Sequence, residues 1–360
     1  MKFIFIILIL VTFFTYGAEE KKYVGGQVVL DTATIRGDDF SGTGREVRSA
    51  RVFIDGEFGE RTEYEIEYSF TGNNEWKDVY VKHKLFDNLG IQIGNMKEPM
   101  SLEQVSSSKN SSFSERSLIN AFINHRKLGV MVQGKFKQGV QRGGITLGIF
   151  GKSLDKLFEK KEDGVSIISR ITYALVYAKD DILHLGVSIG QTKYHQKKIK
   201  ISTDAGSHLY EGSLLKRKIK NIEKTKRIGI ESAMVKGAFS FQGEYLSFTA
   251  LSPKEHFKFD GWYGQISWFA TGEHKKYKVK SAKFSQTKIK KSALEFAFRA
   301  SKIRIKDKDQ IPQEEVDLTI AINYYHRQNI RLISSYTFAQ AKKKQTQKEN
   351  LLQLRLLYTF

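Results

Sequence analysis

Cysteine is absent from this chain of 360 residues. Without thiols the protein can form no disulfide, no thiolate metal site and no cysteine nucleophile. Acidic residues are also scarce relative to basic ones, because 39 Asp and Glu stand against 59 Lys and Arg, a formal net charge of +20. Nucleic acid is the usual partner of such a charge.

Long hydrophobic runs are missing apart from one at the N-terminus. Lys2, an apolar stretch at 3–14 and a small-residue zone at 15–18 are typical of a signal peptide. The apolar stretch is shorter than the roughly 20 residues of a membrane-spanning helix. We therefore expect residues 1–18 to be removed and residues 19–360 to form one domain; an uncleaved N-terminal anchor is the alternative. An exported protein rarely meets nucleic acid. The positive charge therefore favours a protein whose basic residues line a path for small anions. The alternative is that surface lysines suit an anionic lipid surface.

The last ten residues alternate with a period of two, which indicates a β-strand. Apolar and aromatic side chains occupy one face: Leu352, Leu354, Leu356, Tyr358 and Phe360. Such a strand suits a wall between lipid and water, and it resembles the C-terminal signature of bacterial outer-membrane barrels. Since no later segment could form a transmembrane helix, a membrane protein with this sequence has to be a closed β-barrel.

Sixteen alternating or apolar β-rich runs follow one another from Tyr23 onward. They are 24–35, 47–58, 61–71, 76–86, 89–97, 126–137, 140–151, 165–178, 182–195, 227–236, 238–249, 257–271, 291–304, 315–328, 330–339 and 350–360. An even number is what a single-chain bacterial barrel needs. We predict an all-β fold, a 16-stranded antiparallel transmembrane β-barrel; 14 and 18 strands are the alternatives.

Three connections between these strands are too long for tight turns: 98–125, 196–226 and 272–290. With both termini on the periplasmic side, the first two are extracellular and the third is periplasmic. Long loops on a rigid scaffold commonly carry function.

Alternation along the strands also predicts which charged side chains face the lumen. A cation facing lipid at mid-depth costs about 2–4 kcal/mol. We therefore expect the following basic residues to line the pore: Arg51, Lys82, Lys84, Arg170 and Arg299.

Several segments, in order along most of the chain, resemble the phosphate-selective porin O and P family. They are 94–103, 106–108, 115–117, 120–122, 243–245, 261–263, 270–273 and 293–301. The resemblance implies a trimeric 16-stranded outer-membrane channel that passes phosphate or other small anions. It also implies a lumen narrowed by an inward-folded extracellular loop, a second basic extracellular loop and a long basic periplasmic turn.

By this resemblance, loop 98–125 is the constriction loop. Ser107 and Ser108 match the family's anion-contacting serines, and Lys109 and Arg116 add positive charge. The alternative is a solvated, serine-rich external loop. Phosphate-specific members carry a lysine where this chain has Gln104, which leaves a general anion porin open.

Two further basic sets come from the other long connections. In 196–226, a ladder of Lys216, Lys218 and Lys220 would draw anions inward; the alternative is a solvated basic flap or a contact with lipopolysaccharide. In 272–290, a relay would be formed by Lys275, Lys276, Lys278 and Lys280 if the turn folds into the lumen.

No motif indicates catalysis, a metal or a cofactor, because the eight histidines lack metal-ligand spacing and none pairs with a serine. We expect a porin of the bacterial outer membrane, not an enzyme, that passes small anions passively and favours phosphate. The expected partners are inorganic phosphate or other small anions, outer-membrane lipid and lipopolysaccharide, and two further copies of the chain, without nucleic acid. A general anion or polyphosphate porin and a plugged structural or adhesive barrel are the alternatives.

Overall fold

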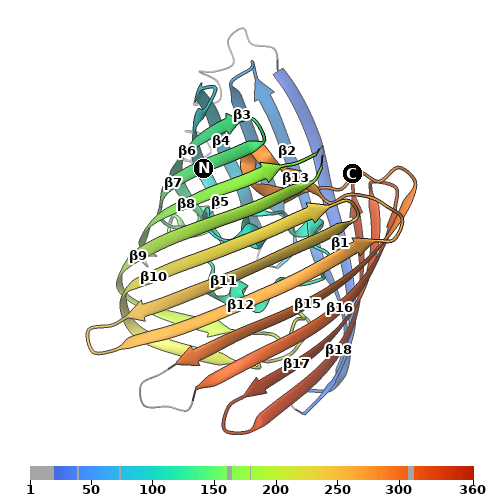
Figure 1. Cartoon of the computed structure of the whole chain (residues 1–360). Helices are drawn as coiled ribbons and strands as arrows, with labels where there is room; N and C mark the ends of the chain where they lie inside the picture. Colours follow the sequence, from blue (N-terminus) through green and yellow to red (C-terminus); the bar gives the residue numbers. More distant parts are fainter. Residues whose placement is uncertain (1–19, 39, 73, 160–163, 179, 307–311) are drawn as a thin grey trace.

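In the computed structural model, sixteen strands close into one antiparallel barrel (Figure 1). The structure describes residues 20–38, 40–72, 74–159, 164–178, 180–306 and 312–360. The expected signal peptide, 1–18, lies outside the described residues. Over the described part of the chain, no helix is both long enough and apolar enough to cross a membrane.

The barrel strands follow the sequence order, and each pairs with the next. They are β1 (Glu20–Gly37), β2 (Gly42–Phe58), β3 (Thr62–Ser69), β4 (Glu75–Phe86), β5 (Leu89–Lys97), β6 (Arg126–Gln138), β7 (Gln141–Phe150), β8 (Val165–Val176), β9 (Ile182–Ser202), β10 (Lys216–Lys236), β11 (Phe239–Leu251), β12 (His256–Phe269), β15 (Ser292–Lys306), β16 (Gln313–His326), β17 (Ile330–Lys342) and β18 (Thr346–Thr359). A separate two-stranded sheet consists of β13 (Lys276–Lys278) and β14 (Lys283–Ser285). The predicted fold class is confirmed.

The barrel closes where β18 pairs with β1, with Thr359 opposite Gln27. The N–H of Gly26 donates to the carbonyl of Phe360 over 3.0 Å. A Cβ on Gly26 would lie 2.4 Å from the Phe360 ring and 2.6 Å from the carbonyl oxygen of Arg51. Glycine at this position therefore lets the terminal aromatic residue pack directly on the first strand.

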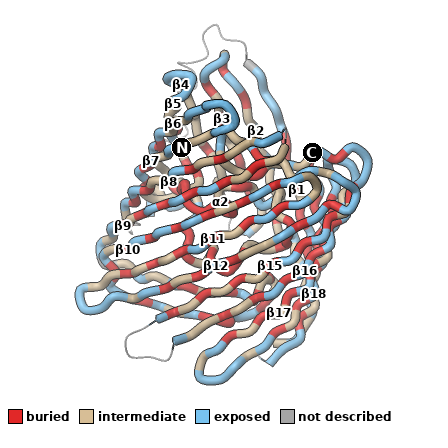
Figure 2. The backbone as a smooth tube through the Cα atoms, viewed as in Figure 1, coloured by how far each residue is buried: buried red, intermediate tan, exposed pale blue. Residues whose placement is uncertain are grey.

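Side chains alternate between the lipid-facing surface and the interior, as the sequence predicts (Figure 2). On β8, Ile167 and Ile171 are 52% and 57% exposed, whereas Arg170 between them is 5% exposed. On β15, Phe296 and Phe298 are exposed and Arg299 is buried. The large apolar side chains that remain exposed on the strands therefore form the lipid-facing surface.

Loop 98–125 lies inside the barrel. It contains the short helices α2 (Leu102–Val105), η1 (Ser108–Asn110) and η2 (Leu118–Phe122). The helix η2 packs against β11, β12 and β15, where the Phe122 ring stacks on Phe248 with centroids 5.8 Å apart. The resulting apolar cluster attaches the C-terminal part of the loop to one side of the barrel wall.

The second long connection is shorter than predicted. Strand β9 ends only at Ser202, and β10 already begins at Lys216. The loop between them is therefore 203–215 and not 196–226. The extensions are strands because their lysines alternate with isoleucines that face inward. Ile201 and Ile219 are 1% and 2% exposed and belong to one cluster with Leu214 and Leu215 of the loop. Lysine is depleted in strands, but here the period-two pattern of isoleucine decides the structure.

This extension also corrects the predicted basic ladder. Lys216, Lys218 and Lys220 are exposed on β10, on the face opposite to Ile219. None of the three lines the internal cavity described below. They form a row on the outer surface of the barrel and do not face the lumen.

Candidate functional site

The described part of the barrel encloses a large cavity of about 2360 Å³. Its lining comes mainly from the inner face of β1–β9, from loop 98–125 and from the inward-folded turn that carries β13 and β14. Its lining includes 22 lysines and arginines but only 11 aspartates and glutamates. The cavity is therefore wet and positively charged, which favours anions.

Loop 98–125 is held to the opposite wall by buried carboxylates. Glu244 on β11 accepts the N–H groups of Leu102 (3.0 Å) and Glu103 (2.7 Å) at the start of α2. On β15, Glu295 accepts the hydroxyl of Ser112 at 2.6 Å. Carboxylates on two strands thus fix both the beginning and the middle of the loop.

Glu115 of this loop binds two arginines of the barrel wall. Arg48 Nε donates to its carboxylate over 3.1 Å and Arg355 Nη2 over 2.7 Å; Arg355 also binds Asp31 at 2.6 Å. Burial raises the pKa of Glu115, but the two guanidinium groups outweigh burial and hold the pKa at about 2. The side chain therefore stays ionised and joins the loop to β1, β2 and β18.

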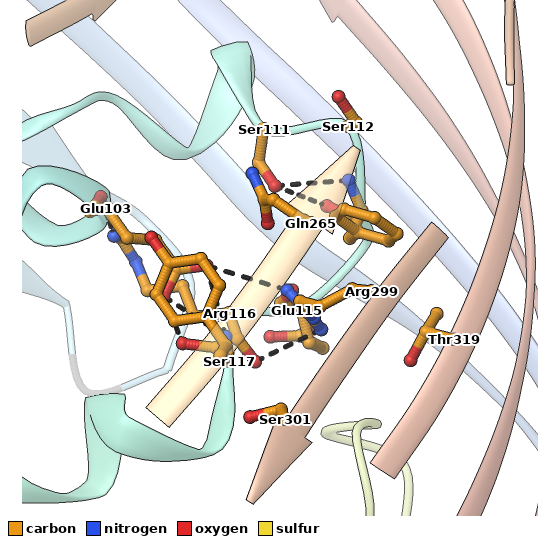
Figure 3. A network of polar contacts seen from close by, with 12 residues as sticks. Glu103, Ser111, Ser112, Glu115, Arg116, Ser117, Gln265, Arg299, Ser301 and Thr319 are labelled. Atoms are coloured by element: carbon orange, nitrogen blue, oxygen red, sulfur yellow. Dashed lines mark hydrogen bonds and ion pairs between the residues drawn. The ribbon is translucent and has the colours of Figure 1, made fainter. Parts of the chain in front are cut away.

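Arg299 lies beneath the loop and does not line the cavity, contrary to the sequence prediction (Figure 3). Its Nη1 donates to the carbonyl of Glu115 over 2.9 Å and lies 3.5 Å from the carboxylate of Glu103. The guanidinium also stacks 4.5 Å above the Phe113 ring. Arg299 is thus a structural support of the loop.

The four residues predicted for the constriction all line the cavity: Ser107, Ser108, Lys109 and Arg116. Lys109 Nζ lies 5.3 Å from the centre of the Phe53 ring on β2, a cation–π contact. Arg116 is partly engaged within the loop, because its guanidinium donates to the carbonyls of Glu103 and Ser106. Ser107, Ser108 and Lys109 therefore keep the donors that an anion could use.

The predicted wall cations are paired with acidic residues. Arg51 lies 3.5 Å from Glu67, and Lys82 lies 3.0 Å from Glu63. These two residues line the cavity, as does Arg170, which lies 2.5 Å from Glu231. Lys84 does not line the cavity; it lies 3.9 Å from Glu63 and donates to the carbonyl of Glu60.

An acidic strip on β3 and β4 was missed by the sequence analysis. It consists of Glu63, Glu65, Glu67 and Asp78, all of which line the cavity. Arg126 neutralises part of it, at 2.5 Å from Asp78 and 3.2 Å from Glu67. The signal was present in the sequence, because glutamates spaced two apart on a strand share one face.

The periplasmic turn between β12 and β15 folds into the lumen. The hydroxyl of Tyr277 on β13 lies 2.6 Å from Nδ1 of His184 on β9, and Arg170 donates to the carbonyl of Ala282 over 2.9 Å. The N–H of Phe284 donates to Ser106 Oγ over 3.2 Å. The turn is therefore bound both to the wall and to loop 98–125.

The lysines of this turn differ in position. Lys275 is half-buried and binds the buried Glu295 at 3.2 Å, so it anchors the turn. Six others line the cavity: Lys276, Lys278, Lys280, Lys283, Lys288 and Lys290. Within the described residues none of these six forms an ion pair. Burial lowers the pKa of Lys283, and the nearby Glu65 and Asp78 oppose part of that effect.

The ion pair between Lys82 and Glu63 on the barrel wall gives a first prediction. Lys82→Gln alone should shift the reversal potential of the channel towards cations, because it removes a positive charge from the cavity and leaves Glu63 with only the more distant Lys84. Adding Glu63→Gln should restore most of the original value, because the double change removes no net charge. Equal reversal potentials for the single and the double variant would contradict this role of the pair.

Comparison with known proteins decides the family. The sequence profile described as "Phosphate-selective porin O and P" matches residues 23–360, nearly the whole described barrel. The chain belongs to this family. It is an outer-membrane porin, which agrees with the C-terminal strand and the lipid-facing apolar surface.

Two sequence relatives of the porin were found among curated proteins. A protein of Caulobacter vibrioides, named only as uncharacterized, is 27% identical over 268 residues, 69% of this chain and 52% of that protein. Porin O of Pseudomonas aeruginosa is 28% identical over 130 residues, 32% of this chain and 30% of Porin O. The porin thus spans about half, or less, of the length of the relatives it matches.

Solved structures share the porin's fold at low sequence identity. The anion-selective porin from Comamonas acidovorans has a TM-score of 0.63 at 11% identity, over 95% of this chain and all of that one (100%). OmpT of Vibrio cholerae has a TM-score of 0.63 at 9% identity, over 95% of this chain and 98% of that one. At these identities the likeness concerns the fold alone.

Proposed function

We propose that this porin passes small anions by passive diffusion and favours inorganic phosphate. The observation that carries the proposal is the set of lysines that the inward-folded turn contributes to the cavity lining without an ion pair among the described residues: Lys276, Lys278, Lys280, Lys283, Lys288 and Lys290. They project into a cavity in which the wall cations Arg51, Lys82 and Arg170 are neutralised by carboxylates. The turn lysines and Lys109 therefore add to the positive charge of other lining lysines that form no ion pair in the described structure, such as Lys127 and Lys135.

The comparisons support this proposal in two ways. The family is described as phosphate-selective, and a porin with the same fold is described as anion-selective. Neither description concerns this chain itself, in which Gln104 takes the place of a lysine. A general anion porin is accordingly the main competing function.

The cavity offers what a partly dehydrated phosphate needs. Ser107 and Ser108 supply hydroxyl donors, and Lys109 beside them supplies charge. The acidic strip on β3 and β4 lines the same cavity and opposes tight binding of an anion. Binding that is strong enough to admit an ion but weak enough to release it is the condition for conduction.

Phosphate preference can be tested by single-channel recording of the purified porin in chloride, with phosphate then added. We expect phosphate to block the chloride current. The triple change Ser107→Ala, Ser108→Ala and Lys109→Gln should weaken the block about tenfold, the effect of losing roughly 1.4 kcal/mol of binding. A control with the same charge change, Lys216→Gln on the outer surface, should leave the block intact.

Three outcomes separate the candidate functions. Anion-selective current without block by phosphate would leave a general anion porin, in keeping with Gln104. Block that survives the triple change would contradict the site at Ser107, Ser108 and Lys109. No conductance at all would favour a plugged structural or adhesive barrel.

We also propose that the porin is a homotrimer, on the strength of its family resemblance. Mass photometry of the detergent-purified protein should give about three times the 41.3 kDa of one chain, after allowance for detergent and for a cleaved signal peptide. A stable single-chain species with full channel activity would contradict the trimer.

A further inference from the structure

The outer surface of β9–β12 carries a compact group of lysines just beyond the apolar surface. On β9, Leu185, Val187 and Ile189 face outward and are exposed, and Lys193 follows four residues after Ile189. On β10, Ile228 and Ile230 face outward, and Lys226 and Lys224 come next towards the extracellular end. The change from apolar to basic therefore occurs at the same height on both strands.

Strand register places these lysines side by side. Lys224 lies directly opposite Lys193. Lys226 lies opposite Thr249 of β11, and Thr249 lies opposite Lys258 of β12. The inward neighbours Thr192 and Thr225 are buried, so Lys193 and Lys224 point outward. We call Lys193, Lys224, Lys226 and Lys258 the outer lysine cluster.

Direct cross-strand pairing of two lysines is unfavourable by itself, because like charges opposite each other on one face repel. Within the described residues, no member of the outer lysine cluster forms an ion pair. The neighbouring cations show the contrast, since Arg304 and Lys306 on β15 bind Asp260 at 2.9 Å and 3.3 Å. The cluster therefore lacks the protein carboxylate that neutralises the adjacent basic residues.

We propose that the outer lysine cluster binds the phosphate groups of lipid A, the glycolipid anchor of lipopolysaccharide in the outer leaflet. The two parts of this molecule match the two parts of the surface. Acyl chains would lie along the exposed apolar residues of β9 and β10, and the phosphates would lie above them between Lys193 and Lys224. Neighbouring strands are about 4.8 Å apart, so two lysines on adjacent strands can contact one phosphate.

Cluster residues lie on the outer face, so this proposal concerns anchoring in the membrane and not conduction. It rests on the location of the porin in the outer membrane and not on its preference for phosphate. The two proposals can therefore fail separately: lipid A binding tests the cluster, and channel currents test the lumen.

The test is a titration of the detergent-purified full-length porin with purified lipid A, with bound lipid counted by native mass spectrometry. Lys193→Gln with Lys224→Gln should weaken lipid A binding about tenfold or more. A matched control, Lys137→Gln with Lys236→Gln, removes the same charge from exposed positions at the periplasmic ends of β6 and β10 and should change binding less than about twofold. The reversal potential should stay unchanged in the Lys193→Gln, Lys224→Gln variant, because both lysines point outward.

A second arm varies the lipid and needs no variant protein. Enzymatically dephosphorylated lipid A should bind the unaltered porin weakly. Its affinity should be no higher than the affinity of intact lipid A for the Lys193→Gln, Lys224→Gln variant. Equal binding of intact and dephosphorylated lipid A would overturn the proposal, because acyl chains alone would then account for the contact. Intact lipid A binding equally to the variant and to the unaltered porin would overturn it as well.

Discussion

Changing Lys278, Lys280 and Lys283 together to glutamate should remove the anion selectivity of the channel or invert it to cation selectivity. These side chains line the cavity from the inward-folded turn, and no described carboxylate pairs with them. The triple change replaces three positive charges by three negative ones opposite a strip that is already acidic. In a narrow lumen with low-dielectric walls such a reversal acts strongly on permeating ions. The measurement is the reversal potential in a planar bilayer under a chloride gradient.

The structure provides a matched control for this experiment. Lys216→Glu, Lys218→Glu and Lys220→Glu change the charge by the same amount on the outer surface of β10. This variant should keep the selectivity of the unaltered porin, apart from a small long-range effect that salt screens. If the outer triple variant lost selectivity as fully as the inner one, the assignment of the turn lysines to the ion path would be wrong.

The second large effect concerns the attachment of loop 98–125. Glu115→Gln should lower the free energy of unfolding by about 2 kcal/mol, because it removes charge-assisted hydrogen bonds to the buried Arg355 and to the half-buried Arg48. The effect depends on pH in a defined direction. The pKa of Glu115 falls from 4.5 to about 2 on folding, so its stabilisation is complete above about pH 4.5 and is lost as the pH falls through 2. Thermal unfolding at pH 6 and at pH 2 measures both.

At pH 6 the variant should unfold at a clearly lower temperature than the unaltered porin, and at pH 2 the two should converge. Glu211→Gln is the matched control, since Glu211 is exposed in loop 203–215 and should contribute little. Equal unfolding temperatures of the Glu115→Gln variant and the unaltered porin at pH 6 would contradict the role of this residue.

Most of the fold could be predicted from the sequence because a barrel strand carries its own evidence. The period of two that places Ile167 outward and Arg170 inward is a local property, and sixteen such runs account for all sixteen barrel strands. The long connection 98–125 follows from the gap between two well-marked strands. Only 196–226 was wrong, because its lysines concealed the alternating inward isoleucines, such as Ile201 and Ile219.

The candidate site was harder to predict, because it depends on contacts between distant segments. Alternation predicts that Arg299 faces inward, but it gives no indication that Glu115 and Phe113 cover this residue. The same applies to Arg51 and Lys82, whose partners lie on the neighbouring strand β3 and whose charge is therefore compensated. Whether the basic turn hangs free or folds inward depends on contacts such as Tyr277 with His184, 93 positions apart in the sequence.

The most direct test of the central claim is the reversal potential of the unaltered porin in a planar bilayer under a chloride gradient. The lumen described above, with its unpaired lysines from the periplasmic turn, predicts a potential of the sign given by anion-selective permeation. A potential of the opposite sign would mean that the acidic strip on β3 and β4 controls the current, and it would contradict the account.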